Sequence, residues 1–128
     1  MPSPGASQPA ILLVGEDIEL LDTRAAVLRN TGAEVKCLRS AQVPESAGLK
    51  AFDLIILCHT LGEPEARTIA DAAERLFHPP FILLLNSLSG PRQERSGIRF
   101  DAVVEAAPEV LVRTASELLS RRNGTCED

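Results

Sequence analysis

The chain alternates short apolar runs with segments of helical character. The runs span residues 10–14, 33–38, 53–58, 80–87 and 100–106. In most of these runs apolar residues follow one another without alternating polar residues. This pattern is typical of strands that are buried on both faces. Strands that alternate with helices predict a parallel sheet with helices packed on both sides. We therefore expect an α/β protein with a three-layer, doubly wound sheet.

Helical segments fill the gaps between these runs. Residues 17–31 carry a stripe of apolar residues at helical spacing, formed by Ile18, Leu21, Ala25 and Leu28. Asp17 is the expected N-cap, and Gly32 stands just past the end. Residues 63–77 and 108–122 predict two further helices, and residues 40–52 are ambiguous, with a short helix as one reading. Right-handed crossovers and five strands favour the flavodoxin-like strand order 2-1-3-4-5.

The 128 residues suit one domain. We expect a disordered tail over residues 1–9, a folded domain over 10–122 and a frayed tail over 123–128. The sequence predicts no targeting leader and no membrane span, and we expect a cytoplasmic protein. Since only six residues follow Arg122, a partner would have to supply any output.

Composition argues against several classes of function. The net charge is −5 and no basic stripe is visible, which disfavours nucleic-acid binding. Three cysteines lie far apart and match neither a disulfide framework nor a CxxC metal site. A zinc site built from His59, His78 and Cys58 or Cys37 matches no familiar spacing. We expect no cofactor.

Polar residues follow several of the predicted strands. They are Gly15, Glu16 and Asp17 after the first, Cys58 and His59 after the third, Asn86 and Ser87 after the fourth, and Glu105 at the end of the fifth. In open parallel sheets ligands bind outside the carboxyl ends of the strands. We therefore expect these residues to converge, although they come from distant parts of the sequence.

The segment FDLIILCHTLG, residues 52–62, resembles the third strand of response-regulator receiver domains. That strand normally ends in Asp and is followed within a few residues by Leu-Pro. ILLVGEDIELLDTRAAVLRNTGAEV resembles the opening of the same family, and PEVLVRTASELL resembles its last helix. The resemblance covers residues 10–121 and implies the fold of the chemotaxis signalling proteins.

The resemblance assigns a role to each site position. Cys58 stands where receivers carry the phosphorylated Asp, and Gly15 and Glu16 stand at the two acidic positions that hold Mg²⁺, with Asp17 one place later. Asn86 or Ser87 takes the Thr/Ser position. Glu105 falls at the Lys position, and no Lys lies nearby.

This chain therefore resembles a degenerate receiver. A phosphoaspartate cannot form at Cys58, and a thiolate is a soft ligand that suits Mg²⁺ poorly. Glu105 would repel a phosphoryl group where a Lys would attract it. Only a weak Mg²⁺ site at Glu16 and Asp17 is conceivable, and helix capping explains these two residues better.

Two readings of Cys58 stay open. Free cysteine is commonly a small buried hydrophobe, and this interpretation is favoured. A reactive thiol would need a positive neighbour, whereas Glu16 and Asp17 would raise its pKa.

The polar segment 88–99 is where receivers usually carry a fourth helix. Its Gly, Pro and Ser residues predict a helix that is short or absent. Together with exposed residues of the last helix it forms a candidate interaction surface. The residues of that surface are Arg92, Arg95, Arg99, Arg113 and Glu117.

These observations favour a non-enzymatic, stand-alone receiver-like module in two-component signalling. It would act by protein–protein contact, with a histidine kinase, another receiver or a transcription factor as the partner, and its oligomeric state is open. One alternative is a redox- or ligand-sensing switch in the Cys58 and Glu16 pocket. A small α/β enzyme is a weaker alternative, because the chain has no Gly-rich phosphate loop and no Ser-His-Asp signature.

Overall fold

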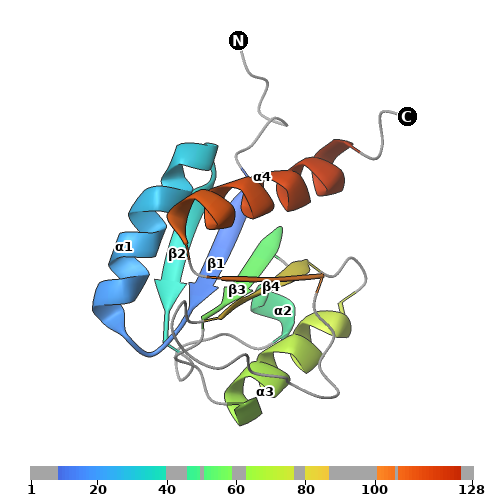
Figure 1. Ribbon diagram of the computed structural model, residues 1–128. Coiled ribbons are helices and arrows are strands. Elements are labelled where there is room, and N and C mark those ends of the chain that lie inside the picture. The colour runs from blue at the N-terminus through green and yellow to red at the C-terminus, as the bar shows by residue number, and fades with distance from the viewer. Residues whose placement is uncertain are drawn as a thin grey trace.

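A five-stranded parallel sheet lies at the centre of the protein (Figure 1). The computed structural model describes residues 9–39, 46–49, 51–58, 63–76, 80–86, 101–105 and 107–124. Side chains of 46, 47, 63, 86, 105 and 122–124 are excepted from that description. The strand order is β2-β1-β3-β4-β5, as the sequence predicts.

The strands are short and lie close to their expected positions. They are β1 (Ala10–Val14), β2 (Glu34–Leu38), β3 (Leu54–Leu57), β4 (Phe81–Asn86) and β5 (Ala102–Glu105). The helices are α1 (Ile18–Leu28), the single turn η1 (Arg29–Thr31), α2 (Ser46–Leu49), α3 (Glu63–Glu74) and α4 (Pro108–Gly124). The ambiguous stretch 40–52 thus contains one short helix, and α4 continues beyond the expected residue 122.

Helices cover both faces of the sheet, with α1 and α4 on one side and α2 and α3 on the other (Figure 1). Successive strand residues point to opposite faces, so Ile11 and Leu13 pack toward α1 and α4 while Leu12 and Val14 pack toward α3. All four are fully buried. This two-sided burial explains why the runs of the central strands β1 and β3 are apolar throughout.

The first helix, α1 with the turn η1, begins and ends at the residues that the sequence predicts. Asp17 is the N-cap of α1, and its Oδ1 accepts hydrogen bonds from Glu19 N at 3.1 Å and Leu20 N at 3.3 Å. Gly32 ends η1 with φ of 85°, in the left-handed region that favours glycine. Both predictions are confirmed.

Several expectations lie outside the described residues. They concern the tail 1–8, the polar segment 88–99 with its short or absent helix, and residues 125–128. Among the helices that the structure describes, none combines the length and hydrophobicity that crossing a bilayer requires.

Candidate functional site

The predicted site residues leave the sheet at one edge. Val14 of β1 pairs with Leu57 of β3, so Gly15 and Cys58 follow in the next row. Cys58 N donates to Val14 O at 2.9 Å, which holds the two chain segments side by side. The backbones of Asn86 and Glu105 pair in register at the ends of β4 and β5. The backbone convergence is as the sequence predicts, whereas His59 and Ser87 lie outside the described residues.

Cys58 is part of the core. Its exposed fraction is 1%, and it clusters with Leu54 and Ile56 on the side of the sheet that α1 and α4 cover. Burial raises the pKa of the Cys58 thiol, and the charge of Arg24 and a hydrogen bond from it act in the opposite direction. The pKa of Cys58 is therefore raised, as expected, but burial is the main cause and not the expected charges of Glu16 and Asp17.

Arg24 is a site residue that the sequence reading missed. It lies on the inner face of α1 with 9% of its surface exposed, and its charge and hydrogen bonding act to lower the pKa of the Cys58 thiol. A signal was available, because Arg24 stands three residues after Leu21 and belongs to the same helical stripe. Ile18, which the sequence reading placed on that stripe, is instead 55% exposed.

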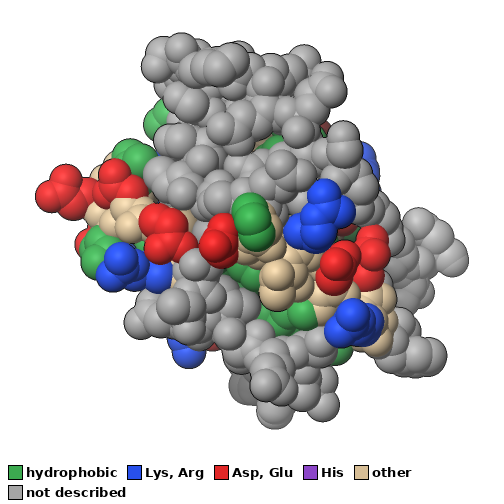
Figure 2. All heavy atoms as spheres, turned by 90° about the horizontal axis from the view of Figure 1, so that it is seen from below, with side chains coloured by type: hydrophobic (Ala, Val, Ile, Leu, Met, Phe, Trp, Pro, Cys, Tyr) green, Lys and Arg blue, Asp and Glu red, His purple; other side chains and the backbone are tan. Residues whose placement is uncertain are grey.

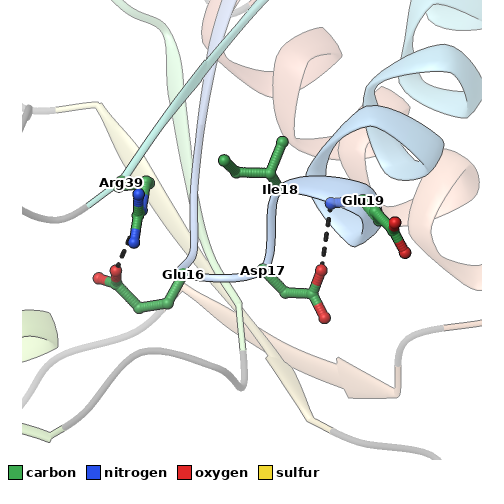
Figure 3. Close-up of a pocket in the computed structure, with 5 residues that line it drawn as sticks. All are labelled: Glu16, Asp17, Ile18, Glu19 and Arg39. Carbon is green, nitrogen blue, oxygen red and sulfur yellow. Dashed lines mark hydrogen bonds and ion pairs between the residues drawn. The ribbon is translucent and has the colours of Figure 1, made fainter.

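Glu16 and Asp17 have partners of their own (Figure 3). Glu16 Oε1 lies 3.7 Å from Arg39 Nε, in an ion pair that is largely open to solvent. Asp17 is engaged as the α1 cap. Among the described residues, no three His, Cys, Asp or Glu side chains gather as a metal site would need. The capping interpretation of Asp17 is confirmed.

A hollow of about 420 Å³ opens beside the start of α1 (Figure 3). Its lining consists of Glu16, Asp17, Ile18, Glu19 and Arg39. The Ile18 side chain is an apolar contact point in a mainly acidic rim. This combination is better suited to a protein partner than to an enclosed small molecule.

The wider surface carries charges of both signs. Seen toward the carboxyl ends of β1 and β2, the described residues present acidic and basic side chains interspersed (Figure 2). Arg113 and Glu117 are exposed on α4, as expected for the candidate interaction surface. Arg92, Arg95 and Arg99 of that surface lie outside the described residues.

The raised pKa of Cys58 predicts a loss of stability in alkali. The folded state binds the thiol proton more tightly than the unfolded chain, whose thiol has the ordinary value 9.0. This contribution is therefore complete below about pH 9 and is lost as pH rises through the folded pKa. Urea midpoints at about pH 8 and about pH 10 should show a steeper fall for the wild type than for Cys58→Ala.

An equal fall in the two proteins would contradict this assignment. Cys37 provides a graded comparison for Cys58. Burial and the charge of Asp22 raise the pKa of this half-buried thiol too. Cys37→Ser should also flatten the alkaline fall, but by less, because Cys58 is the more deeply buried thiol.

Comparisons with known proteins give the fold its context. No protein-family model and no curated protein matches the sequence. Solved structures do match. A CheY-like response regulator receiver domain protein from Methanospirillum hungatei superposes with a TM-score of 0.68 and 20% identity, over 93% of this chain and 99% of that one.

Two further structures show the same architecture. The chemotaxis protein CheY4 of Vibrio cholerae has a TM-score of 0.66 and 18% identity, over 88% of this chain and 99% of that one. A pilus assembly-related protein of Burkholderia pseudomallei has a TM-score of 0.67 and 24% identity, over 89% of this chain and 91% of that one. Strand order, layers and these superpositions agree, and the chain has the fold of the CheY-like response-regulator receiver domains.

Proposed function

We propose that this protein is a non-enzymatic, degenerate receiver module that acts in the cytoplasm by binding a protein partner in a phosphorelay or two-component pathway. The observation that carries this proposal is the state of Cys58. A buried thiol, packed toward α1 and α4, stands where the resemblance to receivers places the phosphorylated Asp. A receiver without an acceptor can still present its surface to partners.

The surroundings of Cys58 also disfavour the usual phosphorylation chemistry. A carboxylate acceptor and hard oxygen ligands for Mg²⁺ are both needed, and the position offers sulfur. Glu16, at the second acidic position, is engaged with Arg39 at the rim. Gly15, at the first, has no side chain to contribute.

Acetyl phosphate with Mg²⁺ tests the loss of phosphorylation. We expect no gain of a phosphoryl group in the intact mass of the wild type, because Cys58 offers no carboxylate. A receiver with an intact acceptor Asp, treated in parallel, shows that the reagent is active. A phosphoryl gain in this protein that disappears in Glu16→Gln would overturn the proposal.

The hollow beside α1 is the described surface that fits a partner best. Ile18 is 55% exposed there, among Glu16, Asp17 and Glu19. Burying such a side chain contributes roughly 1.5–3 kcal/mol, so its replacement by a charge should weaken binding at least tenfold. A complementary partner would place an apolar side chain and basic residues against this rim.

Crosslinking in the native cytosol, followed by binding measurements with the purified partner, tests this surface. We expect a histidine kinase, a receiver or a transcription factor among the crosslinked proteins, and a partner from a pilus assembly machinery would match the Burkholderia similarity instead. Ile18→Glu should raise the Kd at least tenfold, whereas Val103→Glu, at a 38% exposed position on β5, should not. Crosslinks confined to Arg113, Glu117 and the segment 88–99 would move the interface to the other candidate surface.

A further inference from the structure

Arg24 is a buried cation with an unsatisfied donor. Its exposed fraction is 9%, and among the described residues its Nη1 has no hydrogen-bond partner. Leu21 and Ala25, its neighbours along the helical stripe, are buried in the core cluster. A buried polar atom without a partner is costly, and a buried guanidinium without an anion is more so. A negatively charged group next to the Arg24 guanidinium would therefore be stabilised.

Cys58 is the group that this cation meets. The charge of the guanidinium and hydrogen bonding from it act on the thiol, while Nη1 has no acceptor among the described residues. The thiol is neutral and gives the charge no counter-ion. An oxygen atom added to the Cys58 sulfur would carry negative charge beside the guanidinium and would offer Nη1 an acceptor. A charge-assisted bond of this kind is about twice as strong as a neutral one.

We propose that Cys58 is a site of reversible oxidation by hydroperoxides, and that Arg24 holds the anionic product. The thiol sulfur attacks the peroxide O–O bond and takes one oxygen, so that Cys58 becomes a sulfenic acid and hydrogen peroxide becomes water. Loss of the sulfenic proton gives a sulfenate, which pairs with Arg24. A thiol reductant first forms a mixed disulfide with Cys58 and releases water. A second thiol then attacks the reductant sulfur of this disulfide, so that the two reductant thiols become a disulfide and the Cys58 thiol is released.

The sheet geometry favours a persistent sulfenate over an internal disulfide. Cys37 pairs with Leu13, and Leu13 pairs with Ile56, so Cys37 lies two strands away from Cys58 and two residues earlier in register. Strand spacing and rise place the two Cα atoms about 11 Å apart, beyond the roughly 7 Å that a disulfide allows. Cys37 therefore cannot resolve the oxidised sulfur without backbone movement.

We expect the oxidation of Cys58 to be slow, because the thiol is buried. Only 1% of Cys58 is exposed, and burial keeps the thiol protonated. The peroxide has to reach Cys58 through local opening of the structure around it. Arg24 thus acts on the product more than on the rate, and it is a positioning residue.

The first experiment measures the oxygen gained. The full chain is treated with hydrogen peroxide at neutral pH, and peptide mass spectrometry follows Cys58 in the Cys37→Ser, Cys126→Ser background. A serine at position 37 can keep the hydrogen bond that the Cys37 thiol donates to Leu21 O. We expect one oxygen on Cys58, removed by dithiothreitol. An unmodified Cys58, while the urea-unfolded chain gains the oxygen, overturns the proposal, and so does a Cys37–Cys58 disulfide in the wild type.

The second experiment asks whether Arg24 recognises the product. The thermal midpoint is compared before and after oxidation in the same background, with Arg24→Met and Arg24→Lys. Met replaces the buried guanidinium with an apolar chain of similar length, which a core tolerates. Oxidation should raise the midpoint by several degrees in the Arg24 protein, lower it in Arg24→Met, and leave Arg24→Lys between the two.

The sign of the shift separates this role from a merely structural one. A packing role for Arg24 would change the midpoint of the reduced protein but not the difference between reduced and oxidised forms. If oxidation lowers the midpoint equally in the Arg24 and Arg24→Met proteins, Arg24 does not hold the sulfenate and the proposal fails.

Discussion

Ile56→Ala should destabilise the protein by about 2–5 kcal/mol, which is a large fraction of the 5–15 kcal/mol typical of a domain. Ile56 is fully buried at the centre of β3, with Leu13 and Leu83 beside it in register. Its side chain contributes to the cluster under α1 and α4. Neighbours on both strands limit the collapse of the cavity that the shorter side chain leaves.

Urea unfolding measures this effect. The midpoint should fall, with the slope unchanged, because the surface exposed on unfolding is nearly the same. Val103→Ala is the matched control, since Val103 is 38% exposed on the edge strand β5 and should cost much less. Equal losses at the two positions would contradict the assignment of β3 to the centre of the core.

Asp53→Ala should cost roughly 1.5–3 kcal/mol, the range for a hydrogen bond to a charged group. Asp53 precedes β3, and its Oδ2 accepts from Ala10 N at 2.9 Å while its own N donates to Ala10 O at 2.8 Å. Phe81 N donates to Asp53 O at 3.2 Å. This residue therefore ties β1, β3 and β4 together at the amino edge, opposite the candidate site.

Asp53→Asn is the matched variant for this clamp, because it keeps an oxygen acceptor and should lose less. Asp101 repeats the arrangement at β5, where its Oδ2 accepts from Ile82 N at 2.8 Å. Asp101→Ala should therefore behave as Asp53→Ala does. A loss below about 0.5 kcal/mol for Asp53→Ala would mean that the carboxylate contributes no more than an ordinary surface group. Neither change should alter oxidation of Cys58.

The sequence predicted the sheet well because its signals are local. Runs such as residues 10–14 and 53–58 are apolar on both faces, and only a strand covered on both sides can bury them. Asp17 and Gly32 mark the ends of the first helix through their own side-chain and backbone chemistry. Once five strands alternate with helices, handed crossovers leave few possible orders.

The candidate site was predicted only in part. Parallel strands end at the same edge, so the convergence of Gly15, Cys58, Asn86 and Glu105 followed from topology. The electrostatic environment of Cys58 did not. The sequence suggested Glu16 and Asp17 as its charged neighbours. These two residues line the hollow beside α1, and the charged residue that acts on the thiol is Arg24.

The sequence by itself determined the helices and strands and their order, because both depend on residue identity and short-range periodicity. Only the tertiary structure decided that Arg24 lies on the buried face of α1 and Ile18 on its exposed face. Helical spacing defines a stripe but not its exact centre, and the docking of α1 against β1 and α4 sets its rotation. That rotation places a cation beside a buried thiol and an apolar side chain at the rim of the hollow, and helical spacing alone does not decide which of these two residues is buried.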